Sequence, residues 1–83
     1  MELLNLRQIE VFRAVMEAGS FTGAAQMLHV SQPAISRLVR HLELRLGVNL
    51  FDRLHGKLLP TPEARTLHAE VQRSYRGIRS IQS

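Results

Sequence analysis

Cysteine is absent from this 83-residue sequence, aromatic residues are few and hydrophobic runs are short. Without cysteine the chain can form no disulfide framework, no thiolate metal site and no cysteine nucleophile. The apolar stretches are too short to span a membrane, and the first residues lack the basic and apolar regions of a signal peptide. One Tyr, three Phe and no Trp argue against a platform that stacks unpaired bases. The expected location is the cytoplasm.

Patterns that carry catalysis or bind cofactors are also missing. The four histidines, at positions 29, 41, 55 and 68, lie twelve to fourteen residues apart, so no pair has the spacing of metal ligands. No glycine-rich phosphate loop follows an expected strand, and no pair of carboxylates stands out. We therefore expect no catalytic residue, no metal site and no cofactor, and we do not expect an enzyme.

The net charge of +4 is unevenly distributed. Residues 1–30 carry two basic and three acidic side chains, a net charge of −1, whereas residues 31–83 carry nine basic and four acidic ones, a net charge of +5. A basic half beside a nearly neutral half favours a polyanionic partner. Charge alone leaves an ordinary basic surface equally open.

Apolar residues at helical spacing predict three short helices before residue 48. Asn5, Ser20 and Ser31 are suited to cap their first turns, and Gly19 and Gly47 are suited to end the first and the third. From residue 48 to residue 60 the helical period is lost. Residues 50–53 and 57–60 then predict two short strands of a hairpin, with residues 54–56 as its turn.

A last helix is predicted from Thr61-Pro62-Glu63, which supplies a cap, a proline in the first turn and an acid near the positive helix end. Six of its residues, all apolar except the serine, are spaced 3, 4, 3, 4 and 3 apart, as in the seam of a coiled coil: Ala64, Leu67, Val71, Ser74, Ile78 and Ile81. A second copy of the helix is the expected cover, although packing on the chain's own core remains an alternative. The helices of such a pair could run parallel or antiparallel.

Helix, helix, tight turn, helix and hairpin is the order of a winged helix-turn-helix. The predicted fold is mainly α, with three helices and a small wing over residues 1–60 and a linker or dimerisation helix over residues 61–83. The third helix, about residues 32–47, is expected to bury one face formed by Ile35, Leu38, Val39, Leu42 and Leu46.

The opposite face of the third helix carries side chains suited to reading a DNA duplex. Gln can pair with adenine and Arg with guanine, and Pro offers an apolar surface to a thymine methyl group. The expected base contacts are Gln32, Pro33, Ser36 and Arg37. The expected backbone contacts are Ser20, Thr22, Ser31 and Arg40, and the wing of about residues 50–60 adds Arg53, His55 and Lys57 at a minor groove or along the phosphates. For His55 alone an ordinary exposed turn is the simpler interpretation.

These residues resemble the N-terminal region of LysR-type transcriptional regulators. The resemblance covers nearly the whole chain, and its most specific part is Ser-Gln-Pro-Ala-x-Ser at 31–36 followed by Leu-Glu-x-x-Leu-Gly-x-x-Leu-Phe-x-Arg at 42–53. The other matching positions are Leu6-Arg7-Gln8-Ile9, Phe12, Gly19-Ser20-Phe21-Thr22, Ala24-Ala25, Leu28 and Thr61-Pro62. Two positions depart from the pattern: Glu63-Ala64 stands where many members have Ala-Gly, and Gly23 replaces a longer polar residue.

The resemblance implies a bacterial transcription regulator that binds partly palindromic, often A·T-rich duplex sites. It also implies homodimers that pair through the linker helix at Leu67, Val71, Ser74, Ile78 and Ile81, and a full-length protein that is a dimer or a tetramer. A small-molecule effector would bind a further C-terminal domain, so we expect this chain to be a piece of a longer protein. A protein-interaction module with an acidic partner, an enzyme and an RNA-binding domain are the alternative readings.

Overall fold

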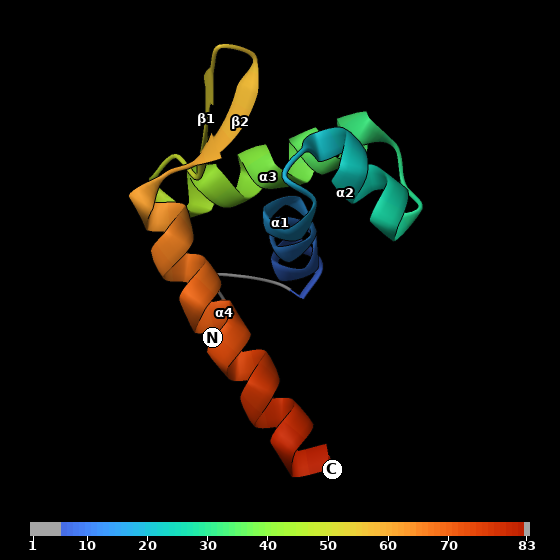
Figure 1. Cartoon of the computed structure of the whole chain (residues 1–83), viewed down its shortest axis with the longest axis vertical. Helices are drawn as coiled ribbons and strands as arrows, with labels where there is room; N and C mark the ends of the chain where they lie inside the picture. The colour runs from blue at the N-terminus through green and yellow to red at the C-terminus, as the bar shows by residue number, and fades with distance from the viewer. Residues whose placement is uncertain (1–5, 83) are drawn as a thin grey trace.

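The computed structural model describes the backbone of residues 6–82 and the side chains of residues 6–74. It contains α1 (Leu6–Ala18), α2 (Phe21–Leu28), α3 (Gln32–Leu46), β1 (Phe51–Leu54), β2 (Lys57–Pro60) and α4 (Pro62–Gln82). The three short helices pack together, the hairpin projects beside α3, and α4 extends away from them (Figure 1). This arrangement confirms the predicted mainly α winged helix-turn-helix. The predicted cap at Asn5 lies outside the described residues.

The turn between α1 and α2 is built as its residues predict. Gly19 adopts a φ of +76°, and the hydroxyl oxygen of Ser20 accepts a hydrogen bond from the backbone N–H of Gly23 at 2.9 Å. A Cβ on Gly23 would lie 2.9 Å from both the Ala18 Cβ and the Ser20 Oγ. The end of α1 and the start of α2 therefore approach too closely for a side chain at position 23, which accounts for glycine in place of the longer polar residue of the family pattern.

The turn between α2 and α3 is equally tight. His29 closes α2 in the left-handed conformation with φ +58°, a region that His visits more readily than most residues. Ser31 then caps α3 by accepting a hydrogen bond from the N–H of Ala34 at 3.2 Å. Pro33 lies in the first turn, where its missing N–H leaves no helical hydrogen bond unmade.

Helix α1 lies at the centre of the core. Its residues Val11 and Val15 pack with Ile35 and Val39 of α3, while Phe12 packs in a second cluster that joins α3 to the start of α4. Burial of the predicted apolar face of α3 is confirmed, because Ile35, Val39 and Leu42 are buried and Leu38 and Leu46 are half-buried. The opposite face of α3 is consequently turned outward.

The hairpin differs from the prediction at its turn. Leu54 is not a turn residue but the last residue of β1, where it pairs with Lys57. The loop is therefore only His55-Gly56, with φ +53° and +76°, and two positive φ values are typical of a tight type I′ hairpin turn. Such a short hairpin is marginal alone, and Phe51 and Leu58 anchor it on the core of α1 to α3.

Thr61 connects the hairpin to α4. Its hydroxyl group donates to the carbonyl oxygen of Asn49 at 2.7 Å and approaches that of Leu50 at 3.2 Å. The same oxygen accepts from the N–H of Ala64 at 3.2 Å and so caps α4. Thr61 is buried, so these hydrogen bonds are made away from water. One side chain thus holds both the loop before the wing and the first turn of α4.

The first turns of α4 pack on α1 before the helix projects away (Figure 1). Ala64 and Val71 are already buried within the chain, and Arg13 of α1 donates to the side-chain oxygen of Gln72 at 2.7 Å. The chain itself therefore covers part of the predicted seam, at Ala64 and Val71. For these two residues the structure matches the alternative in which the last helix packs on the chain's own core. The side chains of Ile78 and Ile81 lie outside the described residues. None of the helices among residues 6–82 is both long and apolar enough to cross a membrane.

We predict that Thr61→Val lowers the free energy of unfolding by about 1–3 kcal/mol, because the buried N–H of Ala64 loses its capping acceptor and the carbonyl oxygen of Asn49 loses a donor. Denaturant unfolding of the variant against the parent chain measures this change. Thr66→Val is the matched control, since the exposed Thr66 hydroxyl bonds only the Pro62 carbonyl oxygen of its own helix. Equal losses in the two variants would contradict the role given to Thr61.

Candidate nucleic-acid interface

The predicted stripe on α3 faces outward. Gln32, Pro33, Arg37 and Arg40 are exposed, and Ser36 is half-buried between them. Their arrangement follows from the burial of Ile35, Val39 and Leu42 on the other side of the helix. The stripe therefore presents an amide, a hydroxyl and two guanidinium groups along one accessible side of a helix.

The ends of two helices adjoin this stripe. The first residues of α2 and α3 line one side of an open groove, through Ser20, Thr22 and Gln32. The oxygens of Ser20 and Ser31 each accept a backbone N–H of their own helix, so their hydroxyl hydrogens can point outward as donors. Helix N-termini also favour negative charge through their unpaired N–H groups. This edge is therefore suited to an anionic backbone.

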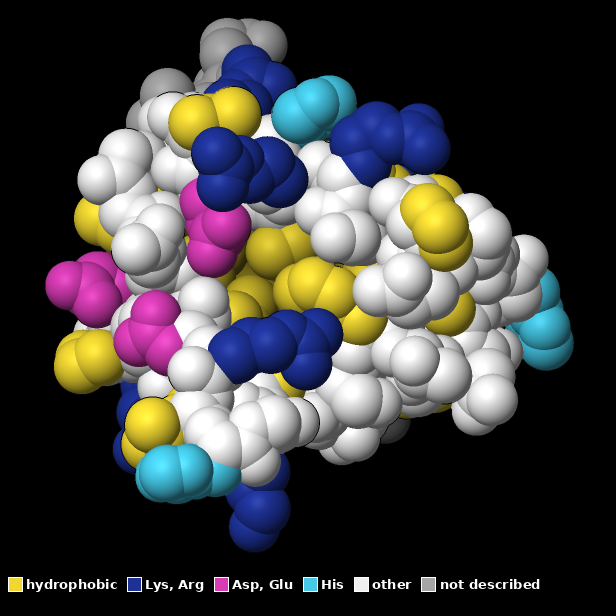
Figure 2. Space-filling model, turned by 90° about the horizontal axis from the view of Figure 1, so that it is seen from above, with side chains coloured by type: hydrophobic (Ala, Val, Ile, Leu, Met, Phe, Trp, Pro, Cys, Tyr) yellow, Lys and Arg dark blue, Asp and Glu magenta, His cyan; other side chains and the backbone are white. Residues whose placement is uncertain are grey.

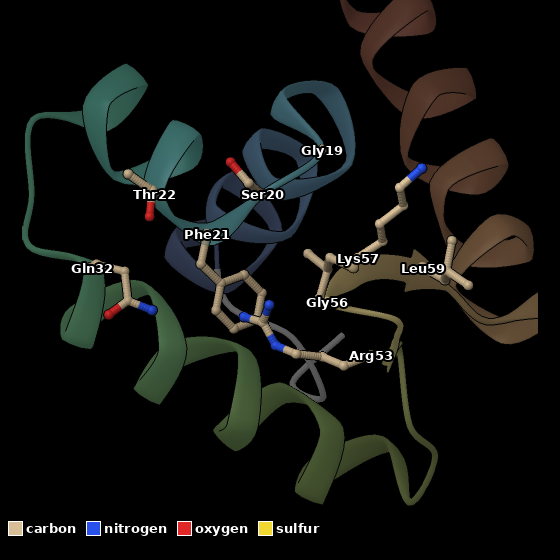
Figure 3. A pocket seen from close by; sticks show the side chains of 10 residues that line it. Gly19, Ser20, Phe21, Thr22, Gln32, Arg53, Gly56, Lys57 and Leu59 are labelled. Carbon is tan, nitrogen blue, oxygen red and sulfur yellow. The ribbon is translucent and has the colours of Figure 1, made fainter.

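The hairpin forms the other side of the groove, which has a volume of about 400 Å³. Arg53, Gly56 and Lys57 line it, and Figure 3 shows the Arg53 side chain extended across the ring of Phe21 while Lys57 points away from both. His55 lies at the tip of the hairpin and is exposed. Of the three predicted wing residues, Arg53 thus lies one residue pair from the end of the hairpin with its side chain toward α2, and His55 and Lys57 lie at the tip.

Seen from the side of the hairpin, the molecule shows a hollow with a hydrophobic floor (Figure 2). Lys and Arg side chains surround it, and the acidic side chains visible in this view gather toward one edge. Within residues 6–74, Arg37, Arg40, Arg53 and Lys57 form no ion pair. These four cations are therefore not neutralised by carboxylates in the part of the chain whose side chains are described.

Glu43 is a structural residue of this face that sequence reasoning did not single out. Its carboxylate accepts the backbone N–H of Leu50 at 2.7 Å and approaches that of Phe51 at 3.4 Å. Glu43 belongs to α3, whereas Phe51 begins β1 and Leu50 immediately precedes it. A carboxylate of the helix thus holds the base of the wing in place. In the sequence, Glu43 stood out only as part of the motif at residues 42–53, which gave no indication of its contact with the hairpin.

Among residues 6–74 there is no group of three or more His, Asp or Glu side chains arranged to hold a metal ion. The exposed stripe, the two helix ends and the wing define a winged helix-turn-helix with one basic, donor-rich face.

Comparison with known proteins identifies the family. The model of the bacterial regulatory helix-turn-helix proteins of the lysR family matches residues 6–65, and the chain belongs to this family. It is 49% identical over 83 residues to the transcriptional activator protein LysR of Escherichia coli strain K12, covering all of this chain and 27% of that protein. Since the relatives are named as regulators of transcription, the expectation that the chain is not an enzyme is confirmed. The chain spans about a quarter of the length of such relatives.

Two solved structures extend the similarity to the fold. One is a BenM DNA-binding domain in complex with catB site 1 DNA, with a TM-score of 0.85 and 32% identity over 94% of this chain and 88% of that one. The other is a complex of a CbnR DNA-binding domain with DNA, with a TM-score of 0.79 and 37% identity over 95% of this chain and 97% of that one. Both cover α1 to the linker helix, so the winged helix-turn-helix is the fold of these domains.

We predict that Glu43→Ala lowers the free energy of unfolding by about 1–3 kcal/mol, since two N–H groups lose a charged acceptor. The amide proton of Leu50 should also move upfield in ¹H–¹⁵N spectra. Asp52→Ala removes the same charge from an exposed position on β1 and should change stability by less than about 0.5 kcal/mol. An unmoved Leu50 amide in Glu43→Ala would contradict the assignment.

Proposed function

We propose that this chain binds double-stranded DNA sequence-specifically, as the DNA-binding part of a dimeric bacterial transcription regulator. The observation that carries the proposal is the outward stripe of α3, with exposed Gln32, Arg37 and Arg40 on a helix whose other side is buried. A major groove admits one α-helix, and a helix-turn-helix presents its second helix there. The DNA complexes of the BenM and CbnR domains support the same use of this fold.

Base reading falls to the residues nearest the start of α3. Gln32, Pro33, Ser36 and Arg37 would meet the base edges, because they form the exposed side of the first two turns. An amide can pair bidentately with adenine and a guanidinium with guanine, and each such pair discriminates by about 1–3 kcal/mol. These four side chains would therefore determine which sequences are preferred.

The remaining polar residues would hold the duplex by its phosphates. Ser20, Thr22 and Ser31 lie at the two helix ends, and Arg40 lies one turn beyond Arg37. Arg53, His55 and Lys57 of the wing would meet an adjacent minor groove or the backbone. Such contacts carry no sequence information, but they orient α3 and make binding strongly dependent on salt.

In this proposal residues 1–60 bind DNA and residues 61–83 form the dimerisation helix. Leu67 is half-buried and Ser74 exposed on α4, and together with Val71, Ile78 and Ile81 they would form the dimer interface. Two recognition helices related by a two-fold axis would read the halves of a partly palindromic site. In the full-length regulator, as a dimer or tetramer in the cytoplasm, a further domain would bind the small-molecule effector.

We predict that Arg37→Ala weakens binding to a selected site far more than binding to unrelated duplex, because it removes a base contact worth about 1–3 kcal/mol. The site is obtained by selecting bound sequences from random duplex DNA, and fluorescence anisotropy gives both affinities. Arg73→Ala is the control, since it removes the same charge from α4, where Arg73 pairs with Glu70. Equal loss on both duplexes would reduce Arg37 to a phosphate contact, and a parent chain without sequence preference would contradict the proposed function.

For Ile78→Glu we predict a monomer in sedimentation and about a hundredfold or greater weakening on a palindromic site, since the second half-site no longer binds intramolecularly. Ser80→Glu adds the same charge to α4 outside the seam spacing and should leave the dimer intact. A dimer of unchanged stability in Ile78→Glu would remove the seam from the proposal without touching the role of α3.

A further inference from the structure

Arg53 and Lys57 lie on opposite faces of the hairpin. Directly paired residues of an antiparallel hairpin share a face, and faces alternate along each strand. Arg53 pairs with Leu58 and lies two residues from Phe51, whereas Lys57 pairs with Leu54. Phe51 and Leu58 pack on the core, so Arg53 lies on the inner face of the wing. Lys57 lies on the outer face.

On this inner face the guanidinium carbon of Arg53 lies 5.7 Å from the centre of the Phe21 ring (Figure 3). A cation at this distance over an aromatic face is attracted by the ring quadrupole. Among the described residues, this ring contact is the interaction that holds the Arg53 head group, which has no carboxylate partner and no hydrogen bond. All five N–H donors of the guanidinium therefore remain available to a ligand.

The ring of Phe21 packs against a second aromatic ring. Phe51 meets it edge to face, with ring centres 6.0 Å apart, and Phe12 of the core lies 5.9 Å from Phe51. This row of three rings begins at the buried Phe12 and ends beneath Arg53. Since aromatic side chains have few rotatable bonds, the row is a rigid support that runs from Phe12 of α1 through Phe51 of β1 to Phe21 of α2.

Arg53 is placed where the two sides of the interface meet. It lines the groove that contains Ser20, Thr22 and Gln32, and it also lines the hollow between α3 and the hairpin that contains Ser36 and Arg40. In the proposed binding mode, with α3 in the major groove, the backbone of the duplex would pass over this junction. A guanidinium presented there matches the bidentate geometry of a phosphate.

We propose that Phe21 is a positioning residue for DNA binding: its ring holds Arg53 at the junction of helix ends and wing, where the guanidinium takes one backbone phosphate of the duplex. This inference rests on the proposed function. The ring holds the Arg53 side chain in its DNA-binding conformation in the free protein, so less side-chain entropy is lost when the duplex binds. Lys57, on the outer face, has no such support, and its contribution is independent of Phe21.

The test is a double-mutant cycle on duplex DNA of mixed sequence, because a phosphate contact requires no operator. Affinities of the parent chain, Phe21→Leu, Arg53→Ala and the double variant are measured by anisotropy over a range of salt concentrations. We expect Phe21→Leu to weaken binding about two- to fivefold when Arg53 is present, the size of an exposed cation–π contact, and to change nothing further in Arg53→Ala. Arg53→Ala should also lower the salt slope by about one phosphate.

Matched variants separate positioning from folding. Phe21→Tyr keeps the aromatic face and should bind like the parent, and the cycle of Phe21→Leu with Lys57→Ala should be additive. Independent losses for Phe21 and Arg53 would overturn the proposal, as would a loss in Phe21→Tyr equal to that in Phe21→Leu. Absence of salt-dependent duplex binding by the parent chain would instead overturn the proposed function itself.

A second measurement needs no variant that disturbs the core. In the free parent chain, the side-chain δ protons of Arg53 should be shifted upfield by the ring current of Phe21, and those of Arg37 should lie at ordinary values. Phe21→Tyr should preserve the Arg53 shift. Ordinary Arg53 shifts in the folded parent chain would overturn the proposal whether or not Phe21→Leu folds.

Discussion

Burial of one side of α3 against α1 is the constraint on which the rest of the molecule depends. Ile35 and Val39 pack with Val11 and Val15, and this contact removes apolar surface from water, the main favourable contribution to folding a small domain. The same contact fixes the rotation of α3 about its own axis. Gln32, Arg37 and Arg40 must then face outward, so the exposure of the polar stripe on α3 follows from the burial of the opposite side of the helix.

The wing and the linker helix are positioned by a few polar groups added to this core. Glu43 ties the beginning of the hairpin to α3, and Thr61 ties the loop before the hairpin to the first turn of α4. Each satisfies backbone groups that would otherwise be buried or partly buried without partners. Both contacts bind segments that follow α3 in the chain, next to the core residues Leu50 and Ala64. They therefore fix the positions of α3, the wing and the start of α4 relative to one another.

The positive charge on the side of the molecule formed by α3 and the wing comes from basic side chains that form no ion pair among residues 6–74. The described ion pairs join residues within α1 or within α4, at Arg7–Glu10, Arg13–Glu17 and Glu70–Arg73. Arg37 and Arg40 of α3 and Arg53 and Lys57 of the wing have no such partners among residues 6–74. In the proposed complex these side chains would exchange water and counterions for phosphates, so that affinity depends on salt while preference depends on the base-facing stripe.

The sequence alone determined the elements and the family. Caps at Ser20, Ser31 and Thr61, the apolar periodicity of α3 and the motif from 31 to 53 are local signals, and each predicts an element or an exposed face without knowledge of the rest. Only the tertiary structure decided which side of the hairpin Arg53 occupies and that its guanidinium lies over Phe21. It also decided that Glu43 reaches Leu50 and that Val71 is buried within a single chain, with 7% of its surface exposed. The physical reason is that these contacts join residues on different elements, and the hairpin's register depends on Leu54 belonging to a strand. Local periodicity fixes a residue's face on its own element, but its partner is chosen by how the elements pack.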